Sequence, residues 1–80
     1  MKAIVNISLK NGVLDSQGKA VHHALDALKF KDVNDVRVGK QIVLDLNASS
    51  KEAAQKEVEE MCEALLANTV IEDYDVEILA

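Results

Sequence analysis

Few side chains in this sequence combine the type and spacing that chemistry requires, and two adjacent histidines are the first candidates. His22 and His23 are the only histidines in the chain. Neighbouring positions on a helix point about 100° apart, so this pair cannot grip one metal ion as an i, i+4 pair does. We therefore interpret both histidines as structural. No Cys-x-x-Cys motif is present, so a zinc ribbon is not indicated.

The single cysteine and a row of carboxylates are the other candidates. Cys62 falls in an apolar helical stripe among acidic neighbours. A catalytic thiol needs an activating base and electropositive surroundings, so we expect Cys62 to pack in the core. Asp73, Asp75 and Glu77 share one side of a predicted strand and could form a metal site or an acid/base pair, although solubility and edge protection explain them more simply. The sequence predicts no catalytic residue, no metal site and no cofactor in this chain.

The glycines around the first predicted helix could form a phosphate cradle, since a helix N-terminus favours anions. Five residues separate Gly12 from Gly18, and the acidic Asp15 is one of them. This spacing fits neither a P-loop nor a dinucleotide fingerprint. A loop that needs flexible backbone is the preferred interpretation.

The charge of the chain argues against nucleic acid as a partner. Nine Lys/Arg stand against 14 Asp/Glu, for a net charge of −5, whereas a nucleic-acid footprint is usually basic. Phe30 and Tyr74 are the only aromatic residues, too few for a stacking platform. Residues 1–40 carry +3 and residues 41–80 carry −8. In a compact fold both halves share one surface, but the split could also supply complementary patches between copies.

Length and hydropathy indicate one small cytoplasmic domain over residues 1–80. No apolar run reaches the ~20 residues that span a bilayer, and the first residues do not resemble a secretory signal. A chain of this length buries a modest core, and one cysteine cannot form an internal disulfide. We therefore expect self-association or docking on a larger protein to supply stability.

Periodicity predicts an α+β fold. Alternating apolar residues predict strands, and i, i+3, i+4 spacing predicts helices. Asp15 or Ser16 can cap the first helix, and Ser49 with Glu52 forms a capping box before the second. The residues expected to face the core are Val21, Ala24, Leu25 and Leu28 on the first helix, Ala54, Val58, Met61, Cys62 and Leu65 on the second, and Tyr74, Val76 and Ile78 on the last strand. Asn68 is a candidate left-handed residue ending the second helix. In order, the predicted elements are a strand at 2–9, a helix at 16–29, strands at 33–38 and 41–48, a helix from 49 to about 67, and a strand at 71–79.

The β-α-β-β-α-β order indicates a two-layer sandwich. The ferredoxin-like arrangement, a four-stranded antiparallel sheet with two helices on one face, is the commonest solution. Gly39-Lys40 would form the hairpin between the second and third strands. Ile4 and Val43 would lie on the second sheet face and, with the open strand edges, would favour a two-fold dimer.

Arg37 lies on an alternating segment whose valines, Val36 and Val38, point inward. Its guanidinium is then expected to point outward, either solvated or paired with a carboxylate of another chain.

Four segments resemble the PurS family, the small subunits of phosphoribosylformylglycinamidine synthase. They occur in the family's order across nearly the whole chain: Gly12–Asp15, Gly18–Val21, Asp35–Lys40 and Asn68–Tyr74. Two departures are visible, because Ser16 and Thr69 stand where the family commonly has proline. Both changes loosen a loop and remove no functional group.

The resemblance implies a non-catalytic subunit of a ligase complex in purine synthesis. It would bridge the glutaminase subunit PurQ and the large synthetase subunit PurL, which uses ATP and Mg, and would support ammonia transfer between them. It would also form a homodimer, or in some cases a tetramer. Candidate interface residues in the matching segments are Asp15, Lys19, Arg37, Lys40 and Tyr74.

A ligand-sensing regulatory domain of the ACT type is the alternative. It shares the β-α-β-β-α-β order and holds an amino acid near the first loop at a dimer interface, although a shared fold is only analogy. Thermal stabilisation by an amino acid would favour this alternative. Binding to two larger subunits would favour the assembly subunit.

Overall fold

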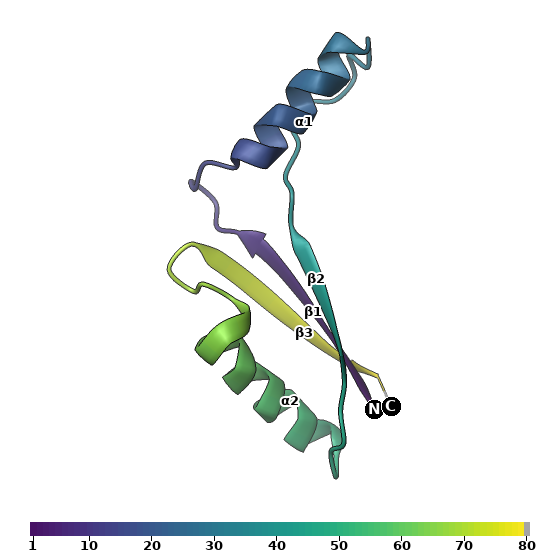
Figure 1. Ribbon diagram of the computed structural model, residues 1–80, viewed down its shortest axis with the longest axis vertical. Helices are drawn as coiled ribbons and strands as arrows, with labels where there is room; N and C mark the ends of the chain where they lie inside the picture. Colours follow the sequence, from purple (N-terminus) through teal and green to yellow (C-terminus); the bar gives the residue numbers. More distant parts are fainter. Residues whose placement is uncertain (80) are drawn as a thin grey trace.

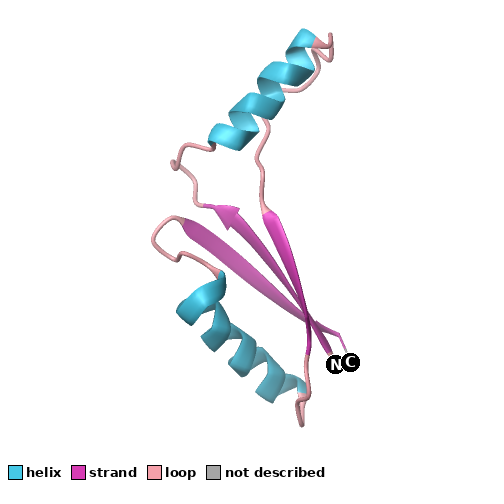
Figure 2. Ribbon diagram, viewed as in Figure 1, coloured by secondary structure: helices cyan, strands magenta, loops and turns pink. Residues whose placement is uncertain are grey.

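The computed structural model describes residues 1–79 and contains a three-stranded antiparallel sheet, two α-helices and one π-helical turn. Within these residues the strand order is β2-β1-β3, so β1 is central and β2 and β3 are edges (Figures 1 and 2). The elements are β1 (Lys2–Leu9), α1 (Ser16–Ala27), β2 (Lys40–Asp45), α2 (Lys51–Met61), the π-turn η1 (Cys62–Leu66) and β3 (Glu72–Leu79).

The alternation of β1 determines which face of the sheet is buried. Ala3, Val5 and Ile7 point to the face that α2 covers and are almost fully buried. The predicted inward residues of β3, including Val76 and Ile78, point to the same face. This face therefore carries the core.

α2 packs over β3 and β1 and buries Ala54 and Val58 against them. The side-chain oxygen of Ser50 accepts a hydrogen bond from the backbone N–H of Ala53, at 3.1 Å, so Ser50 is the N-cap. The expected Ser49–Glu52 capping box was therefore placed one residue early. Either serine could fill this role by composition.

The end of α2 differs from the predicted regular helix. Its last turn is η1, where the N–H of Ala67 donates to the carbonyl of Cys62, five residues back, at 3.1 Å. The wider turn rotates later side chains off the helical stripe: Cys62 is buried, but Leu65 is 83% exposed. Asn68 is not left-handed as expected, because Lys29, after α1, is the one non-glycine residue with positive φ among residues 1–79.

The prediction of a four-stranded ferredoxin-like sheet with two helices on one face is wrong, because residues 1–79 form a three-stranded sheet. Residues 33–38 form no strand, and Gly39-Lys40 makes no hairpin. The chain instead runs on directly into β2, and α1 stands beyond the end of the sheet (Figure 1). The radius of gyration of 16.0 Å exceeds the roughly 12 Å expected for a compact chain of this length.

Candidate interaction surface

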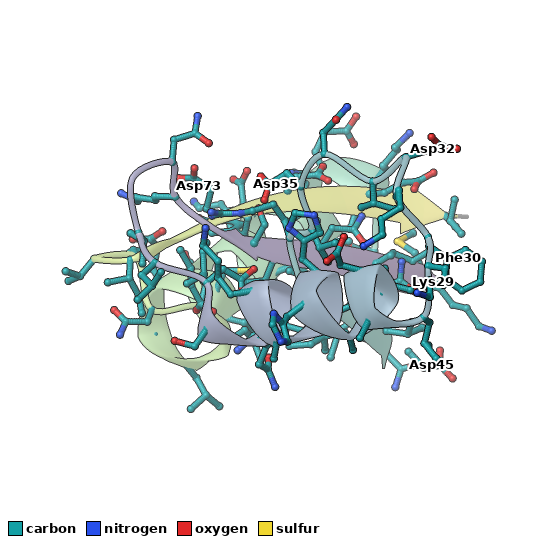
Figure 3. The ribbon with its side chains drawn as sticks, turned by 90° about the horizontal axis from the view of Figure 1, so that it is seen from above. Lys29, Phe30, Asp32, Asp35, Asp45 and Asp73 are labelled. Carbon is teal, nitrogen blue, oxygen red and sulfur yellow. The ribbon has the colours of Figure 1, made fainter. Side chains whose placement is uncertain are left out.

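We use the term arm for residues 10–39, which comprise α1 and the two segments joining it to β1 and β2. α1 has no packing interface comparable to that of α2 with β3. The predicted stripe of α1 is therefore exposed: Val21 is 42% and Leu28 67% accessible. Phe30, beyond the end of α1, is 59% exposed and projects away from the ribbon (Figure 3). The arm thus presents an apolar surface that its own chain does not cover.

A buried carboxylate ties together the two segments at the base of the arm. Asp15 is the N-cap of α1, and its Oδ1 accepts a hydrogen bond from the N–H of Gly18 at 2.8 Å. Its Oδ2 accepts a second bond from the N–H of Val38 at 2.7 Å. These bonds from Val38 and Gly18, with a smaller contribution from the Arg37 charge, hold the pKa of Asp15 below its ordinary 3.8 despite its burial.

Arg37 makes the reciprocal connection from the returning segment to the outgoing one. Its guanidinium donates to the carbonyl oxygens of Leu9 (3.1 Å), Lys10 (3.3 Å) and Val13 (3.3 Å). Its Nε also lies 4.0 Å from Oδ2 of Asp15. Arg37 is exposed, as expected, but its guanidinium binds carbonyl oxygens of its own chain. We use the term clamp for the contacts that Asp15 and Arg37 make between these two segments and with each other.

Two glycines allow the segments at the clamp to approach closely. A Cβ on Gly18 would lie 2.3 Å from the carbonyl oxygen of Val36, and one on Gly39 would lie 2.7 Å from that of Ile7. Both obstacles are backbone atoms, which cannot rotate away as a side chain does. Gly18, in the first turn of α1, is thus required for this close packing.

The clamp predicts an acid-sensitive arm. A lowered carboxyl pKa in the folded state means that Asp15 stabilises the fold above its unfolded pKa, and that this stabilisation is lost as pH falls through the folded pKa. We expect the Val38 amide resonance to keep its hydrogen-bonded shift at neutral pH and to lose it below about pH 4. An NMR pH titration measures this. The Asp15→Asn variant should show no such transition, and an identical transition in that variant would exclude Asp15 as its source.

The remaining candidate interface residues lie at different places. Lys19 is exposed in α1. Lys40 Nζ lies 3.6 Å from Glu72 Oε2, spanning from β2 to β3 across β1. Glu72 Oε1 also accepts from the N–H of Asn68 at 2.7 Å. The structure brings Asp15 and Arg37 together, while Tyr74 lies on β3 beside η1.

Tyr74 is half-buried against the core and its hydroxyl donates to Glu63 Oε2 at 2.7 Å. This hydrogen bond, with desolvation and the Glu63 charge, raises the Tyr74 pKa to about 12. The raised pKa stabilises the fold below pH 10, and this contribution is lost as pH rises from 10 toward 12.

Because Tyr74 is the only tyrosine and no tryptophan is present, its ionisation can be measured by absorbance near 295 nm. We expect a midpoint near pH 12 in the native chain and one closer to 10 in Glu63→Ala. Equal midpoints in both proteins would show that the Glu63 contact does not cause the shift.

Two of the residues considered for chemistry, His22 and Cys62, make contacts that stabilise the fold. His22 Nε2 lies 2.9 Å from the carbonyl oxygen of Val33 within the arm. Cys62 is fully buried, as predicted, and burial followed by the Glu63 and Glu59 charges raises its pKa. Within residues 1–79, no three His, Cys, Asp or Glu side chains gather as a metal site would require, and no helix has the length and apolar character of a membrane span.

Comparison with known proteins assigns a family. The sequence model of the family described as PurS, phosphoribosylformylglycinamidine (FGAM) synthase, matches residues 2–80 of this chain. The PurS subunit of Bacillus subtilis is 51% identical over 77 residues, which cover 96% of this chain and 90% of the relative. That of Methanocaldococcus jannaschii is 43% identical over 77 residues, or 96% and 93% of the two chains.

Solved structures of PurS proteins are similar to this chain over nearly its whole length. A crystal form of B. subtilis PurS matches with a TM-score of 0.89 at 49% identity, covering 99% of this chain and 98% of that one. A chain in the PurLQS structure of Thermotoga maritima matches with a TM-score of 0.89 at 35% identity, covering 98% and 95%.

The fold and the arm define a small α+β protein in which one helix stands apart from the sheet. The chain belongs to the PurS family of FGAM synthase subunits. The family resemblance predicted from sequence is therefore confirmed.

Proposed function

We propose that this chain is the non-catalytic assembly subunit of an FGAM synthase in purine biosynthesis, bridging a glutaminase and an ATP-using synthetase. The observation that carries the proposal is its likeness, over 98% of its length, to a chain in the PurLQS structure of T. maritima. By this proposal PurL and PurQ are the partners, and ATP and Mg bind to the synthetase. The chain supports ammonia transfer without performing chemistry, and works in the cytoplasm, where ATP and glutamine are available.

The exposed arm supports this proposal. An apolar helix face that its own chain leaves uncovered is typical of a protein that functions within an assembly. We propose that the chain forms a homodimer in the complex and that Lys19, Lys40 and Tyr74 contribute to its interfaces. Asp15 and Arg37 act there by positioning the arm.

The ACT-type alternative is not favoured. The hollow lined by strand residues such as Asn6, Gln41 and Asp75, about 430 Å³ in volume, opens to solvent, whereas ligand sites usually bury most of the ligand. An ACT-type domain should gain thermal stability from an amino acid, and we expect no such gain here.

Mixing the chain with PurL and PurQ from the same organism tests the assembly role. Light scattering after size-exclusion chromatography should reveal one complex containing all three chains when ATP, Mg and glutamine are present. Each pairwise mixture serves as a control. Elution of this chain apart from the other two, under every combination of ligands, would contradict the proposal.

A further inference from the structure

The loop from β1 to α1 contains a dipeptide, Asn11-Gly12, whose chemistry the assembly role does not use. The chain has five asparagines, and Asn11 is the only one that glycine follows. Asparagine is a thermolabile residue, because the backbone nitrogen of the next residue can attack its side-chain amide. Glycine has no Cβ to shield that nitrogen. By residue type, Asn11 is therefore the most reactive asparagine of the chain.

The fold leaves this dipeptide open. Residues 10–13 form a β-turn, closed by a 3.1 Å hydrogen bond from the N–H of Val13 to the carbonyl oxygen of Lys10. The φ of Gly12 is +88°, as the third residue of a type II turn requires. The bond that closes the turn does not use the nitrogen of Gly12. Asn11 and Gly12 are both exposed, and a Cβ built on Gly12 would meet no atom within 4 Å.

Other asparagines are less open to this attack. The side chain of Asn6 is hydrogen-bonded to neighbours on both adjacent strands of the sheet. The side-chain oxygen of Asn68 accepts a bond at 3.2 Å from the backbone N–H two residues on. Asn34 is exposed in the same arm as Asn11, but Asp35 follows it and supplies a shielding Cβ. Asn34 is therefore an internal control within the arm.

We propose that Asn11 is a site of spontaneous deamidation and isomerisation. The nitrogen of Gly12 bonds to Cγ of Asn11, the bond from Cγ to Nδ2 breaks, and the side-chain NH₂ leaves as ammonia with the proton of the Gly12 N–H. Water then opens the resulting cyclic imide. Opening at the side-chain carbonyl gives aspartate, and opening at the main-chain carbonyl gives isoaspartate. Either product consumes one water, releases one ammonia and adds one negative charge.

Isoaspartate at this position acts on the clamp through the backbone. It routes the main chain through the β-carbon of residue 11 and so lengthens it by one atom. The carbonyl oxygens of Leu9 and Lys10, which Arg37 binds at 3.1 and 3.3 Å, lie before this point. That of Val13, which Arg37 binds at 3.3 Å, lies after it. A longer chain between them displaces one set relative to the other, so that the guanidinium loses bonds and the base of the arm loosens.

Ageing of the full-length chain at mildly alkaline pH tests the site. Cleavage after lysine and arginine places Asn11 and Asn34 in separate peptides, 11–19 and 32–37, and fragmentation in the mass spectrometer locates each modified residue. We expect Asn11 to be converted about tenfold or more faster than Asn34. Protein isoaspartate methyltransferase should methylate the aged peptide 11–19. Conversion of Asn11 no faster than that of Asn34 would overturn the proposal.

Two variants separate ring formation from other damage. In Asn11→Gln the longer side chain closes its ring more slowly, so peptide 11–19 should keep its mass and should not become methylated. Equal methylation of this variant would show that the isoaspartate does not arise at residue 11. Asn11→Asp, freshly prepared, carries the added charge with the normal backbone path.

Amide exchange tests the effect on the arm. The isoaspartyl form is separated from the native chain by anion exchange, since it carries the extra negative charge. We expect its amides within residues 10–39 to exchange about tenfold or more faster than those of the native chain, because hydrogen bonds to a charged donor are lost. Asn11→Asp should exchange as the native chain does. Native exchange in the isoaspartyl form, or equal acceleration in Asn11→Asp, would contradict the backbone mechanism. Neither measurement includes PurL or PurQ, so the outcome is independent of the assembly role.

Discussion

Replacing Ile7 with alanine is expected to lower the free energy of unfolding by about 2–5 kcal/mol, the usual range for removing a buried branched side chain. Ile7 is 2% exposed on the central strand, where it is among the largest fully buried side chains. A domain of this size has roughly 4–12 kcal/mol of stability in total. The substitution should therefore remove a large share of it.

Urea unfolding monitored by circular dichroism measures this effect, at several protein concentrations because association adds to apparent stability. Val43→Ala is the matched control, since Val43 lies on the outer face of β2 and is 55% exposed. We expect that control to change stability by about 0.5 kcal/mol or less. Similar losses in the two variants would mean that the core does not lie between the sheet and α2.

Reversing the charge of Arg37 is expected to free the arm while leaving the sheet and α2 folded. In Arg37→Glu the new carboxylate faces Asp15 and the carbonyls of Leu9, Lys10 and Val13, all of which are acceptors. We expect amide exchange in the arm to accelerate by about tenfold or more, since lost hydrogen bonds to a charged donor are each worth about 1.5–3 kcal/mol. Binding to PurL and PurQ should weaken in parallel.

Lys31→Glu is the control for that variant, because it makes the same charge change on the same arm. Among residues 1–79, the one ion pair of Lys31 is with Asp26, at 3.0 Å on the surface. Such exposed pairs contribute about 1 kcal/mol or less. We expect near-native exchange and binding. If both variants lose binding equally, the charge of the arm matters and the clamp does not.

The sequence predicts an element well where the periodic apolar residues of that element also form the face that is buried in the core. Alternation placed β1 and β3 within a residue of their observed bounds, because one face of each meets α2. The stripe of α2 placed Ala54, Val58 and Cys62 in the core correctly. It failed at Leu65, because the π-turn that rotates this residue outward has no sequence signature in the helical period.

The arm could not be predicted, because its direction is not a local property. Residues 33–38 alternate as a strand does, and their period is the same whether the chain turns at Gly39 or runs straight. Nonlocal bonds decide between the two: Val38 to Asp15, and Arg37 to the carbonyls after β1. A pattern of side chains does not contain such contacts.

The site was anticipated in its residues but not in its geometry. Asp15 and Arg37 were both singled out, yet they contact each other and their own backbone, and their predicted role in an intermolecular interface is untested. Asp15 was one of two candidate caps before α1 in the sequence, with Ser16, and the structure selects Asp15. Its second bond, to Val38, was not.

By the proposed function this chain acts through its surfaces, so its effect should appear in the activity of the whole complex. Glutamine-dependent formation of FGAM is measured with PurL and PurQ, with and without this chain, and again with ammonium chloride as the nitrogen source. We expect omission of the chain to abolish the glutamine-driven rate and to spare the ammonium-driven rate. A glutamine-driven rate that is equal with and without the chain would contradict the account.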